Sequence, residues 1–236
     1  VLYITNRGGN IASIDVFILD GTSATENGRF QNIGYTFEMF HCPYGIAFDA
    51  SGILYVTMND RRQWSTVTDS WILKINTTTL VGTKVQVNGA NFGHLYGCTF
   101  DSSGNFYVAD NTNNEITKIT MTDYATGTAS TYANLYSGLN KPTDIKFDAQ
   151  GNGYICNLGA NNVIKISNTG INSVFGSGLN QPYTLGFNNL DSILYVANLG
   201  IVGGDGSIVR IINGSTTKVP AILPGPGPPT PGGLAN

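Results

Sequence analysis

A tyrosine followed by an aliphatic residue recurs five times in this chain of 236 residues, at intervals of 52, 52, 47 and 41 residues. No other feature restricts the possible folds as strongly. Self-similarity at a period of 20–50 residues is typical of solenoids, propellers and other repeat arrays. We therefore predict one structural unit per repeat. The five tyrosines are Tyr3, Tyr55, Tyr107, Tyr154 and Tyr195.

Each repeat carries further short segments with alternating apolar residues around this tyrosine. Four tyrosine segments are preceded by a second element, and a turn with glycine (Gly52, Gly104, Gly151) separates the two in three of them. A third element follows, and then a weaker fourth, for example at 84–87 and 173–175. Four short strands in 40–50 residues are typical of a propeller blade. The preceding elements span 43–49, 95–101, 142–148 and 182–188, and the following ones span 72–75, 116–119, 163–166 and 208–211.

Residues 95–119 and 142–166 resemble the NHL repeat almost position by position. The resembling elements are its Pro-x-Gly-Ile-Ala-x-Asp strand, its Gly-Asn-x-Tyr-Val-Ala-Asp strand and its Asn-x-x-Ile-x-Lys strand. The resemblance implies an all-β protein, a β-propeller of four-stranded antiparallel blades. Five blades are visible in a propeller domain that we place at residues 1–223.

The two ends of the sequence suggest how the ring closes. Residues 224–230 form a connector rich in proline and glycine, and 231–236 read as the start of another first strand. The N-terminal repeat lacks a first strand, so we expect 231–236 to pair with the N-terminal blade and leave no exposed edge. Two alternatives stay open: six blades, with one outside this sequence, or a terminal strand that completes the blade of a neighbouring molecule.

Composition excludes several classes of partner. Charged residues make up 11% of the chain and the formal net charge is −3 with 12 basic residues, too few to favour a nucleic-acid partner. No stretch approaches the roughly 20 apolar residues of a membrane span. Three cysteines without a CxxC pair suggest neither a disulfide framework nor a zinc site. We expect no cofactor, and glycans at the sequons of Asn76 and Asn213 if the protein is secreted.

The start of each first strand should line the mouth of the central channel. Enzymes similar to the gluconolactonases hold a divalent metal there with Asn, Asp and Glu, but this chain offers no carboxylate at these positions. The tyrosines there either plug the channel or form a surface for a sugar or peptide. The corresponding residues are Tyr44, Tyr96, Thr143 and Tyr183.

Two further groups of residues are candidates for function. His41 and His94 precede neighbouring first strands and, with Asp144, form a weak alternative metal set. Arg61, Arg62 and Trp64 lie in a long insertion and combine residue types that are enriched at interfaces.

Some repeated residues have simpler structural interpretations. We expect the five repeat tyrosines in the core or between blades, and the short polar residues after each tyrosine strand to bond to turn amides. The cysteines Cys98 and Cys156 should be buried thiols. One basic residue per third strand should form a solvated face: Lys74, Lys118, Lys165 and Arg210.

These features together favour a non-catalytic propeller on a cell, filament or virion surface. It would contact proteins or glycans through its loops and channel mouth, and could self-assemble. The alternative is a metal-dependent enzyme of the lactonase or lyase type that works at the channel mouth.

Overall fold

The computed structural model describes residues 2–6, 13–19, 24–30, 41–60, 70–79, 81–122, 126–134, 138–188, 193–200 and 206–220. For 2–6, 13–19, 24–30, 41–42 and 60 it describes the backbone alone. The predicted segments 224–230 and 231–236 lie outside the described residues. No helix in the described part is long and apolar enough to cross a membrane.

The described residues form five sheets of mostly antiparallel strands, in the orders β1-β2-β3, β4-β5-β6-β7, β8-β12-β11-β10-β9, β13-β14-β15-β16 and β17-β18-β19-β20. The strands of the first two sheets are β1 (Leu2–Asn6), β2 (Ser13–Leu19), β3 (Ala24–Phe30), β4 (His41–Phe48), β5 (Leu54–Asp60), β6 (Trp71–Asn76) and β7 (Val81–Lys84). Those of the third sheet are β8 (Gln86–Asn88), β9 (Leu95–Phe100), β10 (Phe106–Asp110), β11 (Glu115–Met121) and β12 (Thr126–Ala133). The remaining elements are β13 (Pro142–Phe147), β14 (Gly153–Asn157), the 3-10 turn η2 (Leu158–Ala160), β15 (Asn162–Ile166), β16 (Asn172–Gly176), β17 (Pro182–Phe187), β18 (Leu194–Asn198), β19 (Ser207–Ile212) and β20 (Ser215–Lys218).

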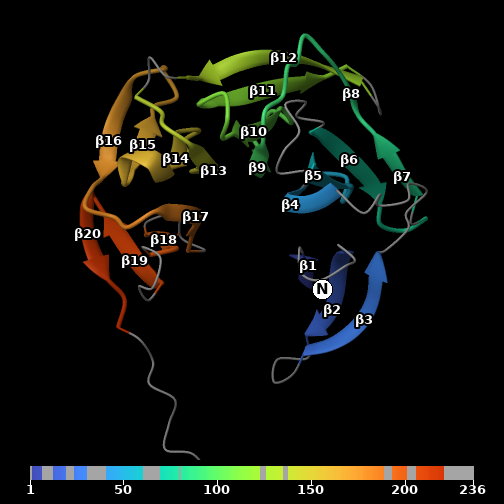
Figure 1. Ribbon diagram of the computed structural model, residues 1–236, viewed down its shortest axis with the longest axis horizontal. Helices are drawn as coiled ribbons and strands as arrows, with labels where there is room; N and C mark the ends of the chain where they lie inside the picture. Colours follow the sequence, from blue (N-terminus) through green and yellow to red (C-terminus); the bar gives the residue numbers. More distant parts are fainter. Residues whose placement is uncertain are drawn as a thin grey trace, which may run out of the picture.

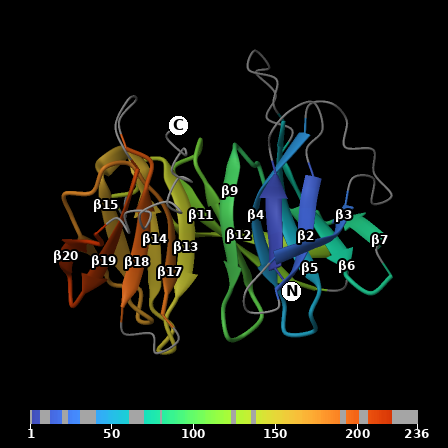
Figure 2. The ribbon, with the colours of Figure 1, turned by 90° about the horizontal axis from the view of Figure 1, so that it is seen from below.

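The sheets stand around a central axis, as Figure 1 shows, so the chain is an all-β propeller as the repeats predict. The edge strands β4, β9, β13 and β17 lie nearest the axis, and β7, β12, β16 and β20 lie outermost. Seen from the side in Figure 2, β9, β13 and β17 run along that axis. The first strand of each repeat therefore delivers its side chains to the channel.

An aromatic contact repeats at three junctions between neighbouring sheets. The ring of Tyr55 packs on Phe100 of the next sheet, with centroids 4.9 Å apart. Tyr107 meets Phe147 at 4.7 Å and Tyr154 meets Phe187 at 5.2 Å. These three tyrosines are at most 5% exposed, which confirms their predicted place between blades.

Tyr195 departs from this pattern. It is 37% exposed, and Ile208 and Ile212 on the neighbouring strand are also exposed. In the described residues no first strand of a following sheet brings a phenylalanine onto it. The prediction that all five tyrosines are buried is therefore wrong for Tyr195, because its sheet lacks a described neighbour on that side.

The basic row is not simply a solvated face. Lys74 is 5% exposed and its Nζ lies 5.0 Å from the centroid of the Tyr55 ring. Lys118 and Lys165 lie over the rings of Tyr107 and Tyr154 in the same way. Each lysine is the cross-strand partner of its tyrosine, so cation–π attraction within each sheet helps to hold the tyrosine ring in place.

The segment 84–87 is not one strand of one sheet. β7 ends at Lys84, and β8 (Gln86–Asn88) pairs in parallel with β12 of the next sheet. Val85 is buried between them and its N–H still donates to the carbonyl of Ile72. The chain thus crosses from one sheet to the next at a buried valine.

Aspartates close the turn between the first and second strands of the repeats. The Asp148 carboxylate accepts hydrogen bonds from the backbone N–H groups of Gln150 and Asn152, the Asn152 amide and the Tyr154 hydroxyl. Burial by itself would raise the pKa of Asp148, but the bonds from Asn152 and Tyr154 outweigh it and lower that pKa below 3.8. Asp101 is held in the same way and its pKa is also lowered.

These bonds predict a pH dependence of stability. A carboxyl group with a lowered folded-state pKa adds stability that is complete above its unfolded-state value and is lost as pH falls through the folded value. We expect Asp148→Asn to reduce the urea midpoint at pH 7 and to flatten its decline below pH 5. Asn188 fills this position in the last described repeat, so the variant should fold. The urea midpoints of both proteins are measured between pH 3 and 7. If the midpoint falls equally with pH in both, Asp148 does not have the lowered pKa described above.

Candidate functional site

The innermost strands enclose a cavity of about 260 Å³ on the propeller axis, which we call the channel pocket. Every residue that lines it comes from β4, β9, β13 or β17. All four residues that the sequence assigns to the channel mouth line this cavity, and their role in binding stays a prediction. The lining residues are Tyr44, Gly45, Ile46, Tyr96, Gly97, Cys98, Thr143, Asp144, Lys146, Tyr183 and Thr184.

The three predicted tyrosines lie together at this pocket. The Tyr96 ring is in the middle, 4.9 Å from Tyr44 and 5.8 Å from Tyr183 between centroids. Thr143 differs, because it is buried and its hydroxyl donates to the carbonyl of Pro182 on the next sheet. The tyrosines thus contact one another across the channel and also line a cavity, so the two interpretations of the sequence are compatible.

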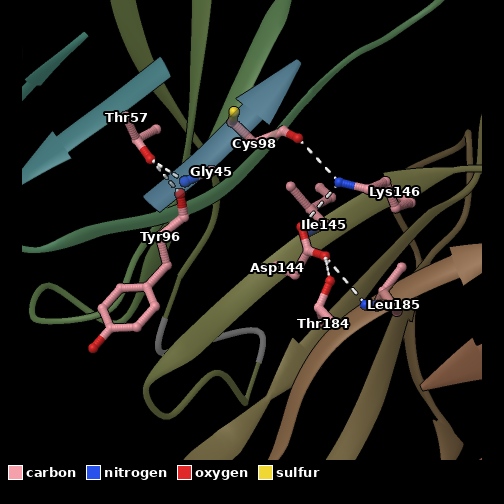
Figure 3. Close-up of polar contacts among 9 residues, drawn as sticks. All are labelled: Gly45, Thr57, Tyr96, Cys98, Asp144, Ile145, Lys146, Thr184 and Leu185. Carbon is pink, nitrogen blue, oxygen red and sulfur yellow. Dashed lines mark hydrogen bonds and ion pairs between the residues drawn. The ribbon is translucent and has the colours of Figure 1, made fainter. Parts of the chain in front are cut away.

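A bulge in β4 positions Tyr44 and its neighbour Gly45. The Gly45 N–H donates to the buried Thr57 hydroxyl, which donates in turn to the carbonyl of Tyr96 at 2.6 Å (Figure 3). A Cβ at Gly45 would lie 2.5 Å from that carbonyl oxygen. Glycine is therefore required where β4 and β9 approach each other at the pocket.

Among the described residues, Asp144 is the only carboxylate that lines the pocket, and all four of its acceptor positions are used. Its Oδ1 accepts from the Ile145 N–H at 2.9 Å and from the Lys146 ammonium at 3.0 Å. Its Oδ2 accepts from the Thr184 hydroxyl at 2.7 Å and the Leu185 N–H at 3.1 Å, both on the neighbouring sheet. Figure 3 shows these bonds fanning out from a carboxylate that is 4% exposed. Asp144 therefore acts as a positioning group.

Lys146 is the cation of the pocket. Its Nζ donates to Asp144 and, at 3.0 Å, to the carbonyl of Cys98 on β9. Burial by itself would lower the pKa of Lys146, but the Asp144 carboxylate outweighs it and raises that pKa above 10.5, so the ammonium is charged at neutral pH. An ammonium has three donors, and within the described residues two are used. With 31% of its side chain exposed, Lys146 can direct the third toward a ligand.

Sequence reasoning named Asp144 but missed Lys146 and Thr184. Asp144 stands where two earlier repeats carry Gly45 and Gly97, and Lys146 follows two residues later on the same strand. A Cβ on Gly97 would collide with the Asp144 carboxylate, so a glycine on β9 makes room for the aspartate on β13. An aspartate in place of a repeat glycine, followed at i+2 by a lysine, is the signal that could have found the site.

Cys98 and Cys156 are buried thiols, as predicted. Burial raises the pKa of the Cys98 thiol to about 12, although Lys146 acts in the opposite direction. Burial raises the pKa of Cys156 as well. Both thiols are free, completely or almost completely buried, and stay protonated at neutral pH.

The pocket does not fit the divalent metal of the gluconolactonase-like enzymes. Hard cations need several oxygen ligands with open lone pairs, whereas Asp144 is saturated and the other predicted positions are neutral hydroxyls. No group of three His, Cys, Asp or Glu side chains in the described residues could hold a metal ion. His94 lies outside the pocket, 3.1 Å from the Thr112 hydroxyl, and of His41 only the backbone is described. His94 and Asp144 therefore do not meet in one site, and the side chain of His41 lies outside what the structure describes.

The other predicted site residues lie elsewhere or are not described. Arg61, Arg62 and Trp64 are outside the described residues. Asn76 ends β6 and its side-chain oxygen accepts two turn N–H groups, while Asn213 is exposed in the turn between β19 and β20. Glycosylation at both stays a prediction.

Comparison with known proteins supports the fold. No protein-family model matches the chain and no curated protein sequence is detectably similar to it, so the NHL resemblance stays a prediction. Among solved structures, a luciferin-regenerating enzyme has a TM-score of 0.66 at 14% identity, over 89% of this chain and 76% of that one. Virginiamycin B lyase from Staphylococcus aureus has a TM-score of 0.62 at 18% identity, over 94% and 67%. A gluconolactonase from Xanthomonas campestris has a TM-score of 0.63 at 12% identity, over 83% and 65%.

These neighbours correct the functional preference drawn from the sequence. That preference was for a non-catalytic surface module, and the three neighbours are enzymes. The sequence argument was wrong because it treated missing metal ligands as missing catalytic groups. The ammonium of Lys146 in the same pocket was not considered. Likeness at these identities establishes the fold, and the activity is taken up below.

Gly97 offers a test of the pocket geometry. Gly97→Ala should push Asp144 out of place and lower the free energy of unfolding by roughly 1–3 kcal/mol. Gly186→Ala on β17 is the matched control, because a Cβ there meets nothing within 4 Å and should change stability by less than about 0.5 kcal/mol. Urea unfolding measures both. Equal stability of the two variants would show that β9 and β13 are not packed as described.

Proposed function

We propose that the protein is an enzyme of the lactonase or lyase kind and that the channel pocket is its active site. The observation that carries this proposal is the Lys146 ammonium, fixed by Asp144 and the Cys98 carbonyl, with one donor left for a ligand. The enzymes with the same fold support it, since two of them are a lyase and a gluconolactonase.

Lactone hydrolysis and elimination next to a carbonyl share one electrostatic need. In both, negative charge develops on a carbonyl oxygen in the transition state. A donor already held in place stabilises that charge without reorganisation, and it does so more strongly where tyrosine rings exclude water. The third N–H of Lys146 supplies such a donor, and Asp144 holds it there without offering a lone pair of its own.

The pocket also limits the substrate. Its volume of about 260 Å³ is below the roughly 300–1,000 Å³ of sites for drug-sized ligands. A single ring fits, either as a whole substrate or as one part of a larger molecule. The rings of Tyr44, Tyr96 and Tyr183 offer apolar faces with hydroxyl tips, which suit a ring that carries polar substituents.

Replacing the cation tests the proposal. Assays with glucono-1,5-lactone, simple γ- and δ-lactones and a cyclic depsipeptide ester should reveal a substrate that the native protein opens. For that substrate we expect Lys146→Met to lower kcat about 10²–10³-fold, because the charge on the carbonyl oxygen loses its donor. Lys218→Met, at an exposed position on β20, is the matched control and should keep full activity.

Folding must be separated from catalysis in this experiment. Removing Lys146 leaves the buried Asp144 charge without its cation, which destabilises the fold. The Asp144→Asn/Lys146→Met double variant removes both charges and should stay inactive, but its asparagine NH2 cannot accept the hydrogen bonds that one carboxylate oxygen accepts, so its urea midpoint should fall as well. Activity is therefore compared at a temperature at which circular dichroism shows each variant to be folded. Full activity in either variant would contradict the proposal. So would a native protein that opens none of the esters.

We also propose that the ring is closed by residues 231–236, which supply a first strand to the sheet of β1, β2 and β3. Tyr195 supports this, because its ring is exposed, whereas Tyr55, Tyr107 and Tyr154 are covered by the next sheet. Residue 236 is an asparagine at the position of the covering phenylalanines, so the rest of the closing sheet would cover the Tyr195 ring. A closed ring places a sheet against the exposed face of β18 and β19. Five blades would then complete the propeller.

Truncation tests the closure. Removing 231–236 should lower Tm by several degrees, because an edge and an apolar face become exposed. Replacing 224–230 with an equally long Gly/Ser linker keeps the strand and should leave Tm almost unchanged. Equal Tm for the full and truncated chains would contradict closure, and a native oligomer that truncation converts to a monomer would favour strand donation between molecules.

A further inference from the structure

A second hollow region lies at the rim of the propeller, away from the axis. Two cavities of about 280 and 250 Å³ meet over the loop 90–92, which lines both of them. One is lined by residues of β6, β7 and β8 and the other by residues of β11 and β12, so they belong to two neighbouring sheets. We call the two cavities together the outer groove. It shares no residue with the channel pocket.

The crossing segment creates this groove. β8 leaves the sheet of β7 to pair with β12, and the loop that follows returns toward β9 between the two sheets. The carbonyl of Asn91 accepts a hydrogen bond of 2.7 Å from the side-chain amide of Asn113, in the turn between β10 and β11. The loop is thus fixed by its backbone, and the Asn91 side chain is left exposed.

The chemistry of the lining indicates a polyhydroxylated ligand. Trp71 and Phe92 supply aromatic surface, with the Lys84 ammonium 5.4 Å from the Trp71 ring centroid. The side chains of Gln86, Asn91 and Ser130 are exposed and make no hydrogen bond within the described part of the chain. Amides and hydroxyls beside an aromatic face match the hydroxyl edges and apolar faces of sugar rings.

The charges in the outer groove favour a neutral ligand. Lys84 and Glu115 are its only charged side chains among the described residues, and they have opposite signs. The Glu115 carboxylate accepts from the Thr117 and Thr131 hydroxyls, so two of its roughly four acceptor positions remain for ligand hydroxyls. We propose that the outer groove binds a neutral oligosaccharide segment, with sugar units on either side of the loop 90–92.

Tryptophan fluorescence provides the test. The chain has two tryptophans, so Trp64→Phe leaves Trp71 as the sole reporter. Titration of this variant with cellotetraose, maltotetraose and chitotetraose should give a saturable change in emission for at least one of them. In the same background, Gln86→Ala/Asn91→Ala should weaken that affinity roughly tenfold or more through the loss of hydrogen bonds.

A channel variant separates this site from the proposed activity. Lys146→Met or the Asp144→Asn/Lys146→Met double variant in the Trp64→Phe background should bind the sugar with unchanged affinity. Three results would overturn the proposal: no saturable change with any of the three sugars, unchanged affinity after Gln86→Ala/Asn91→Ala, or loss of binding in the folded channel variant.

Discussion

The buried carboxylate of Asp144 is the contact on which the channel depends. It joins β13 to β17 through the Thr184 hydroxyl and the Leu185 N–H, and it holds Lys146, which reaches back to β9 through the Cys98 carbonyl. One side chain and its cation thus link three neighbouring sheets at the axis. The cost of burying these charges is offset because each oxygen of the carboxylate accepts two hydrogen bonds. The same saturation leaves the ammonium, and not the carboxylate, to meet a ligand.

The contacts between sheets are of two kinds with separate consequences. Away from the axis, the repeat tyrosines pack on phenylalanines of the next sheet and carry lysines on their outer side, an arrangement that repeats with little variation. At the axis, the repeat is broken by Asp144 and Lys146. The contacts away from the axis are therefore uniform, whereas the residues that line the channel differ from strand to strand. These differences supply the charged groups of the proposed active site.

The features that follow from the repeat period were predicted from the sequence, whereas the features that depend on contacts between sheets were missed. Strand order, the channel-mouth tyrosines and the buried cysteines followed from the repeats. The roles of Lys146 and Gly97 did not, because each depends on a residue about 50 positions away that only the closed arrangement of strands brings near. The three lysines of the basic row were misjudged for a related reason: solvent was considered, but not the tyrosine faces on the neighbouring strand. Arg210 is exposed as predicted. The crossing of β8 at Val85 had no signal in the alternation of apolar residues.

The preference against catalysis rested mainly on the missing metal ligands at the channel mouth. A fold shared with a lyase and a gluconolactonase, together with a fixed ammonium in the pocket, is the basis of the proposal that the protein is an enzyme. The most direct test is a crystal structure with the lactam analogue of an ester that the protein opens. The account predicts the lactam oxygen at about 3 Å from the Lys146 Nζ, with the bonds of Asp144 intact. A lactam bound outside the channel, or bound in it with its oxygen turned away from Lys146, would contradict the account.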